Sequence, residues 1–271
     1  MLRAVFIVTL STLSALLHAQ PVGKGGKSAS RLVMLDRFFN SEQREDSTGK
    51  RHYWHYTWEE TSDPGFSILG NLFKEQGATL ASLDKAPTKA NLDKAAVYII
   101  VDPDNAKDNP HPNYLSTAHI AVIINWVKNG GVLLLLGNDS ANCDLVHLNS
   151  LSKTFGITFT DRKVKAVVND DFQMGKISIS DNLVFSSRDI FLKDVSPLET
   201  RELTGGILWD DKDLIMAVVS YGKGMVFAVG DPWLYNEYID HRRLPESFDN
   251  YGAAKDLVTY LLSLPAQPKT K

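Results

Sequence analysis

Short runs of apolar residues recur along the chain, and each run ends at a polar residue. The runs are "RLVMLD", ending near Asp36, "AAVYIIVD", ending at Asp102, "GGVLLLLGND", with its apolar part at 132–136, and "GMVFAVGD", ending at Asp231. A strand that is apolar at every position is buried on both faces, as in a parallel sheet covered by helices. The chain is therefore expected to build its core on such a sheet.

Segments with helical spacing separate these runs. Asp63 and Pro64 indicate a helix start ahead of an apolar face and a stop at Gly77, and Ser116 is a cap for the next helix. Further helices are expected at about 144–155 and 251–262. The alternation predicts an α/β fold, a three-layer sandwich with a mostly parallel sheet. Short β-like runs at about 157–205 predict a β-rich elaboration or an antiparallel edge.

The ends of the chain differ in character from its middle. Residues 1–19 combine Arg3 with a short apolar run and a small residue at Ala19, which is typical of a signal peptide and too short to span a bilayer. We expect a flexible leader at 20–30, a single α/β domain at 31–264 and a tail at 265–271. The mature protein is expected to be secreted or periplasmic, without a membrane anchor.

Charge and cysteine content exclude several classes of protein. The formal net charge is −3, from 29 Lys and Arg against 32 Asp and Glu, so the chain lacks the basic character of a nucleic-acid-binding protein. One cysteine allows no intramolecular disulfide or paired-cysteine metal site, and His52 and His55 have no further ligands nearby in the sequence. We expect no metal and no cofactor, and the oligomeric state stays open.

Polar side chains follow four of the expected strands. In open α/β sheets, ligands bind beyond the carboxyl ends of the strands. We expect a ligand cleft there, with candidate catalytic carboxylates Asp36, Asp139, Asp231 and Glu237. The candidate ligand-binding residues from these strand ends are Arg37, Asn40, Asp102, Asn138, Ser140, Trp233 and Asn236. Repulsion between the carboxylates is expected to raise at least one pKa unless Arg37 or a cation compensates.

The stretch "HYWHYTWEE" concentrates aromatic rings beside carboxylates. Tyr56, Trp58 and Glu59 are candidate ligand-binding residues, because rings stack on the apolar face of a sugar while polar groups bind its hydroxyls. The alternative is that these rings fold back and cover the edge of the sheet, since amphipathic rings suit both roles.

The turn "GNDSANC" raises the question of a nucleophile. Ser140 or Cys143 would need an oriented base, and His147 lies on the helix that follows the turn, where a base rarely points back at the nucleophile. We therefore do not expect nucleophilic catalysis at this turn.

The stretch "WVKNGGVLLLLGNDSANCDLVHLNSLSKTFGI" resembles non-amidotransferase members of the class I glutamine-amidotransferase-like group, which has a flavodoxin-like fold. The motifs "HYTWEETSDPGFSILGNLF", "YIIVDPD", "GNDS" and "VFAVGDPWLYNEY" resemble a domain of secreted bacterial proteins that is often fused behind unsaturated rhamnogalacturonyl hydrolases. Amidotransferases of the group carry a glycine-flanked cysteine at the turn, whereas this chain has Asn138-Asp139-Ser140. The resemblance therefore does not imply glutamine hydrolysis.

Three functional hypotheses follow from the residues and the resemblance. The first is a secreted carbohydrate-binding or carbohydrate-processing domain associated with pectin and rhamnogalacturonan degradation. The second is a hydrolase, either a sugar esterase or a glycosidase, that uses the carboxylates of the cleft as acid and base. The third is a non-catalytic interaction module.

Overall fold

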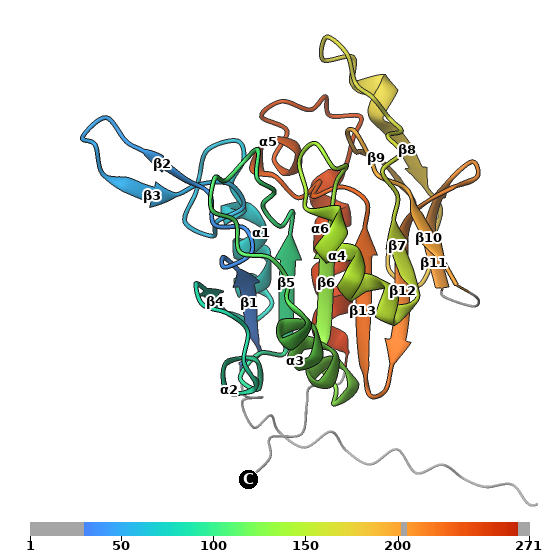
Figure 1. The fold of residues 1–271 in the computed structure, drawn as a ribbon. Coiled ribbons are helices and arrows are strands. Elements are labelled where there is room, and N and C mark those ends of the chain that lie inside the picture. Colours follow the sequence, from blue (N-terminus) through green and yellow to red (C-terminus); the bar gives the residue numbers. More distant parts are fainter. Residues whose placement is uncertain (1–29, 202–204, 265–271) are drawn as a thin grey trace, which may run out of the picture.

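The computed structural model of the protein describes residues 30–201 and 205–264. Its centre is a nine-stranded sheet in the order β4-β1-β5-β6-β13-β12-β10-β7, with β11 also paired to β12 (Figure 1). The predicted α/β class, with a parallel sheet and an antiparallel edge, is confirmed. The predicted signal peptide, the predicted tail and almost all of the predicted leader lie outside the described residues. No helix within the described ranges has the length and apolar character needed to cross a membrane.

Five strands form the parallel part of the sheet. They are β1 (Leu32–Asp36), β4 (Thr79–Leu83), β5 (Val97–Val101), β6 (Val132–Leu136) and β13 (Gly224–Val229). Leu35, Ile99, Leu134 and Phe227 are register partners in one row across β1, β5, β6 and β13. The row allows the strand ends to be compared. β1 ends at the first residue after the row, whereas β5, β6 and β13 extend further in the same direction.

The antiparallel part extends the sheet beyond β13. It contains β12 (Asp213–Tyr221), β10 (Leu198–Thr200), β7 (Ile157–Phe159) and β11 (Gly205–Asp210). Two separate hairpins stand away from it, formed by β2 (Gln43–Glu45) with β3 (Arg51–Tyr53) and by β8 (Lys176–Ile179) with β9 (Arg188–Phe191). The β-rich character of the segment after residue 157 is therefore confirmed, whereas the sequence did not predict the β2–β3 hairpin.

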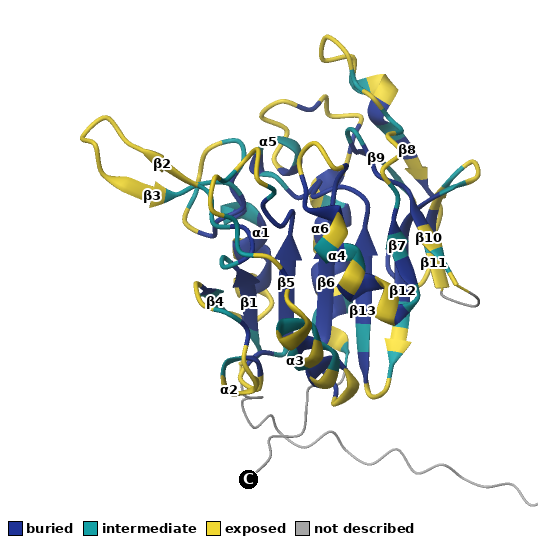
Figure 2. Cartoon of the chain, viewed as in Figure 1, coloured by how far each residue is buried: buried dark blue, intermediate teal, exposed yellow. Residues whose placement is uncertain are grey.

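Helices cover both faces of the sheet. They are α1 (Ser67–Glu75), α2 (Lys89–Leu92), α3 (Thr117–Lys128), α4 (Leu145–Ser152), α5 (Asn236–Ile239) and α6 (Asn250–Ser263), with 3-10 turns η1 (Lys153–Phe155) and η2 (Phe172–Gly175). Alternate strand residues enter opposite cores, so Ile99 packs in the core that contains α1 and α6, and Tyr98 in the core that contains α3 and α4. Figure 2 shows the central strands buried and the β2–β3 hairpin exposed.

The helix ends show one error in the sequence prediction. Ser116 caps α3 through a capping box with His119, as expected, and Gly77 follows α1 with a φ of +85°. However, α1 begins at Ser67 rather than beside Asp63, and its own N-cap residue, Phe66, offers no side-chain hydrogen bond. The side chain of Asn236, far along the chain, accepts the hydrogen bond from the backbone N–H of Ile68 instead.

Candidate functional site

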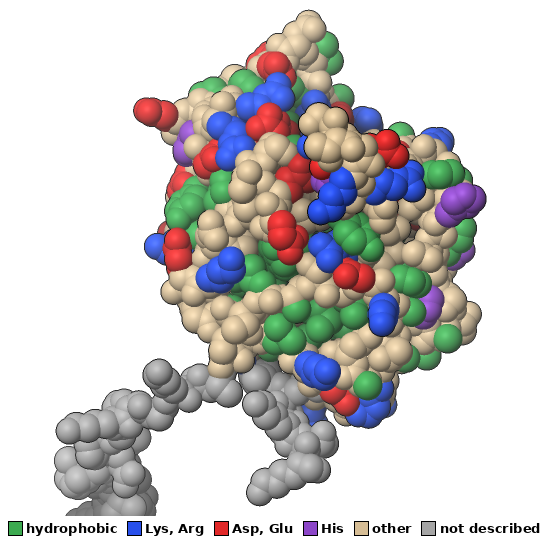
Figure 3. Space-filling model, turned by 90° about the vertical axis from the view of Figure 1, so that its left-hand side faces the viewer, with side chains coloured by type: hydrophobic (Ala, Val, Ile, Leu, Met, Phe, Trp, Pro, Cys, Tyr) green, Lys and Arg blue, Asp and Glu red, His purple; other side chains and the backbone are tan. Residues whose placement is uncertain are grey.

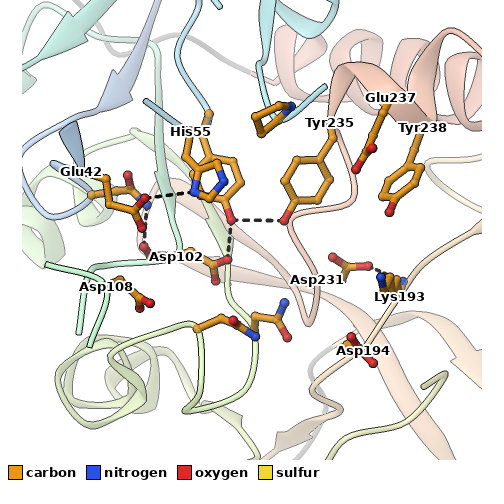
Figure 4. Close-up of a pocket in the computed structure, with 15 residues that line it drawn as sticks. Glu42, His55, Asp102, Asp108, Lys193, Asp194, Asp231, Tyr235, Glu237 and Tyr238 are labelled. Carbon is orange, nitrogen blue, oxygen red and sulfur yellow. Dashed lines mark hydrogen bonds and ion pairs between the residues drawn. The ribbon is translucent and has the colours of Figure 1, made fainter. Parts of the chain in front are cut away.

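A cavity of about 290 Å³ lies beyond the carboxyl ends of β5, β6 and β13 (Figure 4). Its floor comes from the sheet, and its walls come from the base of the β2–β3 hairpin, the loop after β5, the loop after β9 and the segment around α5. The lining residues are Asn40, Glu42, His55, Tyr56, Pro64, Asp102, Asp108, Asn138, Asn142, Lys193, Asp194, Asp231, Tyr235, Glu237 and Tyr238. This position matches the general ligand site of open α/β sheets.

Asp102 lies at the end of β5 and is 3% exposed. Its Oδ2 accepts a hydrogen bond of 2.8 Å from the hydroxyl of Tyr56, whereas its buried Oδ1 receives none from the described N–H and O–H groups. Burial raises the pKa of Asp102 well above its ordinary value, the Tyr56 hydrogen bond opposes this rise, and repulsion from Asp231 adds to it. A carboxyl in this state keeps its proton to higher pH than an exposed aspartate.

Asp231 follows β13 and is also 3% exposed. Its Oδ2 accepts a hydrogen bond of 2.8 Å from the backbone N–H of Lys193. Burial raises the pKa of Asp231 to about 7, and this hydrogen bond only partly offsets the rise. The expected rise of a carboxyl pKa therefore occurs, but its main cause is burial rather than repulsion.

Tyrosine rings form much of the wall above these carboxyl groups. The hydroxyls of Tyr56 and Tyr235 lie 3.1 Å apart, and the ring of Tyr238 meets that of Tyr235 edge-on at a centroid distance of 5.8 Å. Tyr56 has a φ of +52°, and the cavity residues His55 and Asp102 have φ values of +63° and +33°. Such left-handed backbone is uncommon outside glycine and is found at ligand sites where the fold holds a strained residue in place.

The structure brings six of the predicted site residues together around the cavity. They are Asn40, Tyr56, Asp102, Asn138, Asp231 and Glu237. The prediction missed Glu42, His55, Asp108, Lys193 and Asp194 because loops and hairpins carry them. Tyr235 and Tyr238 were also missed, although both belong to the same "GDPWLYNEY" motif as Asp231.

The prediction that Asp36, Asp139 and Asp231 line one cleft is wrong, because only Asp231 does so. Asp36 ends β1 one position beyond the register row of Leu35, below the level of the cavity, and accepts hydrogen bonds from the backbone of Phe38 and Phe39 and from the Tyr98 hydroxyl. Burial raises the pKa of Asp36 to about 7. Asp139 holds the turn after β6 by accepting from the N–H of Ala141, and it forms an ion pair of 2.9 Å with Lys163.

Three other candidates for ligand binding are structural residues. Trp58 is 9% exposed, packs edge-on to Phe73 and donates its indole N–H to the Ala81 carbonyl. Trp233 is fully buried in the core next to α1 and α6. Asn236 is fully buried and hydrogen-bonded to the loop that precedes α1. The alternative interpretation of the aromatic stretch, in which rings cover the sheet, therefore holds for Trp58.

Arg37, Glu59 and Ser140 lie away from the cavity. Arg37 pairs with Asp84 at 2.6 Å and Glu59 at 3.5 Å, and both Arg37 and Glu59 line a separate hollow of about 530 Å³ beside the β2–β3 hairpin. Figure 3 views the molecule from the side of this hairpin and shows acidic and basic side chains intermingled there. Ser140 donates its hydroxyl to Asp161. Arg37 therefore compensates Asp84 and Glu59 rather than the carboxyls of the cavity.

The arrangement at the β6 turn does not support a nucleophile. Cys143 is 1% exposed, and burial together with the nearby charge of Asp102 raises the pKa of its thiol well above the ordinary value. A reactive cysteine needs the opposite, a lowered pKa and access to solvent. Within the described ranges, no group of three or more His, Cys, Asp and Glu side chains is placed to hold a metal ion.

The raised pKa of Asp231 predicts a pH-dependent stability. Below about pH 4 the carboxyl is protonated in both the folded and the unfolded protein. Between about pH 4 and 7 the unfolded state ionises first, so stability falls as the pH rises. A pKa of about 7 in the fold corresponds to a destabilisation of about 4 kcal/mol above that pH.

Asp231→Asn is expected to remove this destabilisation and to add one buried N–H group, which costs about 1 kcal/mol. Urea unfolding should show the variant more stable than the parent by about 3 kcal/mol at pH 8 and no more stable at pH 4. The exposed Glu246→Gln is the matched control and should change neither value. Equal stability of Asp231→Asn and parent at pH 8 would contradict the raised pKa.

Comparison with known proteins identifies solved structures with a similar fold but indicates no activity. No protein-family model matches the chain, and no curated protein sequence matches it. Its fold is shared with the solved structure of the mmIFT52 N-terminal domain, at a TM-score of 0.61 and 14% identity, over 86% of this chain and 97% of that one. It is also similar to Cytoplasmic Protein STM1381 from Salmonella typhimurium LT2, at a TM-score of 0.56 and 13% identity, over 87% of this chain and 100% of that one.

Proposed function

We propose that the chain is a carbohydrate-binding domain whose ligand occupies the cavity at the carboxyl ends of β5, β6 and β13. The observation that carries this proposal is the convergence of polar groups with free hydrogen-bonding capacity. The side-chain amide of Asn138 donates no hydrogen bond within the described residues, and Oδ1 of Asp102 and of Asp231 accepts none from their N–H and O–H groups. A sugar ring offers several hydroxyls, each able to donate and accept.

The size and location of the cavity support the same proposal. Its volume of about 290 Å³ lies just below the range for small-molecule sites, roughly 300–1,000 Å³. A site of this size accommodates one sugar unit more readily than a long segment of a chain. Trp58, once a candidate stacking platform, plays no part, so recognition rests on hydrogen bonds and on the tyrosine rings of the wall.

Titration calorimetry against a panel of neutral, amino and acidic sugars, with rhamnogalacturonan oligosaccharides included, tests the proposal. At least one sugar should bind, and Asn138→Ala should weaken it about tenfold, the effect of one lost hydrogen bond of about 1.4 kcal/mol. The control Asn125→Ala changes an exposed residue of α3 and should leave binding unchanged. Absence of binding across the whole panel would refute the proposal.

A second candidate function is hydrolysis of a sugar bond. The observation in its favour is the presence of two buried carboxyl groups, Asp102 and Asp231, in one cavity, since both have raised pKa values. A carboxyl that keeps its proton can act as a general acid, and a second one, once ionised, as a general base. Product formation from sugars that bind, lost in both Asp102→Asn and Asp231→Asn, would favour this candidate over binding alone.

We also propose that the domain belongs to the flavodoxin-like type that the sequence resemblance implies. The order of the parallel strands supports this, because numbering them along the chain gives 2-1-3-4-5 across the sheet. The link to rhamnogalacturonan, and secretion by way of a signal peptide at residues 1–19, rest on the sequence alone. These parts of the proposal make pectin fragments necessary members of the sugar panel.

A further inference from the structure

The charges that line the cavity are unbalanced. Six carboxyl groups face two basic side chains, His55 and Lys193; the acids are Glu42, Asp102, Asp108, Asp194, Asp231 and Glu237. In a cavity of this composition a bound cation favours the ionised form of the carboxyls, including Asp102 and Asp231, whose pKa values are raised by burial, whereas a bound anion disfavours it.

Only half of these acids have an ion-pair partner among the described residues. Glu42 pairs with His55 at 3.2 Å, Glu237 with Arg243 at 3.1 Å, and Asp194 with Lys163 at 3.9 Å.

Asp102, Asp108 and Asp231 have no basic side chain within 4 Å in the described part of the chain. The charge of Lys193 reaches Asp231 only from a longer distance, where it lowers the pKa of that carboxyl slightly. Asp102 and Asp231 are moreover buried, so solvent screens a charge on either only weakly. Among the described residues, no basic side chain therefore pairs with the carboxyls at the floor of the cavity.

An organic cation fits this floor better than a metal ion. Ca²⁺ and Mg²⁺ need several oxygen ligands around one point, and no such group of side chains is assembled in the described residues. The rings of Tyr56, Tyr235 and Tyr238 line the same space, with Tyr56 and Tyr235 5.4 Å apart between centroids. Tyr56 contacts Asp102 through its hydroxyl, so the wall next to this carboxyl combines a hydroxyl with aromatic rings, and rings beside carboxylates are typical of sites for ammonium groups.

We infer that the ligand is a sugar that carries a protonated amino group, with the ammonium bound between Asp102 and Asp231 beneath the tyrosine rings. This inference rests on the proposed carbohydrate function and specifies the charge of the ligand. It also distinguishes binding of amino sugars from binding of pectin fragments, because a cavity lined by carboxyls disfavours the negatively charged uronate units of pectin. Asn138 remains available to a hydroxyl of the same ring.

The test compares sugars that share a ring but differ in charge through one substituent. Calorimetry at pH 7 should use glucosamine, galactosamine and mannosamine, each beside its neutral parent sugar and its N-acetyl derivative, with galacturonate as the acidic member. At least one amino sugar should bind ten or more times tighter than its neutral parent and its N-acetyl form, and this preference should weaken with added salt. Asp231→Asn should abolish the preference, and Glu246→Gln should leave it intact.

The possible failures are distinguishable. Neutral, N-acetylated or acidic sugars that bind as tightly as the amino sugars would overturn the inference and leave the carbohydrate proposal standing. Tetramethylammonium that binds as tightly as any amino sugar would overturn the assignment of a sugar ligand. Absence of binding by every sugar would refute the proposed function and the inference together. Loss of folding does not confuse the result, because Asp231→Asn is expected to stabilise the protein at pH 7.

Discussion

Trp58→Ala should lower the free energy of unfolding by about 4 kcal/mol, in the range for removal of a large buried aromatic side chain. The ring lies among the core residues below α1, and Gly70 in that helix leaves the room that the ring fills, since a Cβ at Gly70 would come within 3.1 Å of Trp58 Cε3. The variant also loses the indole hydrogen bond to Ala81. Urea unfolding measured by circular dichroism gives the change directly.

The control for this experiment is Trp209→Ala, because Trp209 is 53% exposed on β11. Its loss should cost less than about 1 kcal/mol. Sugar binding by folded Trp58→Ala should equal that of the parent, since Trp58 does not line the cavity. A variant of Trp58 that keeps its stability but loses sugar binding would restore the stacking role that the sequence proposed.

Asn236→Ala should destabilise the protein by a similar amount, about 4 kcal/mol, through lost hydrogen bonds rather than lost packing. The buried side chain accepts from the N–H of Ile68 and donates to the carbonyls of Glu60 and Ser62 and to the hydroxyl of Ser67, at 2.9–3.1 Å. Ile68 and Glu60 are partly buried whereas Ser62 is exposed, and each partner group that water does not reach costs about 1–3 kcal/mol when it is left unpaired. Thermal and urea unfolding would both measure the loss.

Two further variants test whether lost hydrogen bonds cause the destabilisation of Asn236→Ala. Asn125→Ala removes an exposed asparagine from a helix and should be neutral. Asn236→Asp keeps the acceptor for Ile68 but replaces the donor to two carbonyl oxygens with a charged acceptor, so it should be as destabilised as the alanine variant. Unchanged stability in Asn236→Ala, with impaired sugar binding, would instead make Asn236 a ligand contact.

The sequence predicted four strands of the parallel sheet and most of the longer helices because their signals are local. Continuous apolar runs identified β1, β5, β6 and β13, and the Ser116 cap and the glycine after α1 located helix ends within a few residues. The start of α1 was wrong for a physical reason. Its capping group is Asn236, which no window around residues 63–67 contains.

The candidate site was predicted only in part, because the sequence shows where strands end but not which strands are neighbours. Asp102, Asn138 and Asp231 follow buried strands, and the register of the sheet brings all three to one cavity. Asp36 follows a strand too, but β1 ends lower in the register and its carboxyl holds the turn to Phe39. Strand ends in a sequence therefore give a set of candidates, and only the pairing of strands decides which of them meet.

The division of the cavity between floor and walls has an evolutionary consequence. The carboxyls of Asp102 and Asp231 are fixed by the sheet, whereas Glu42 and His55 belong to the base of the exposed β2–β3 hairpin. This hairpin forms a sheet of its own, without strand pairing to the rest of the described chain. Insertions and substitutions are tolerated best in such peripheral segments. Relatives with this fold can therefore acquire new ligand preferences by exchanging residues 42–55 as a unit, while Tyr56, the buried acids and the folding core stay as they are.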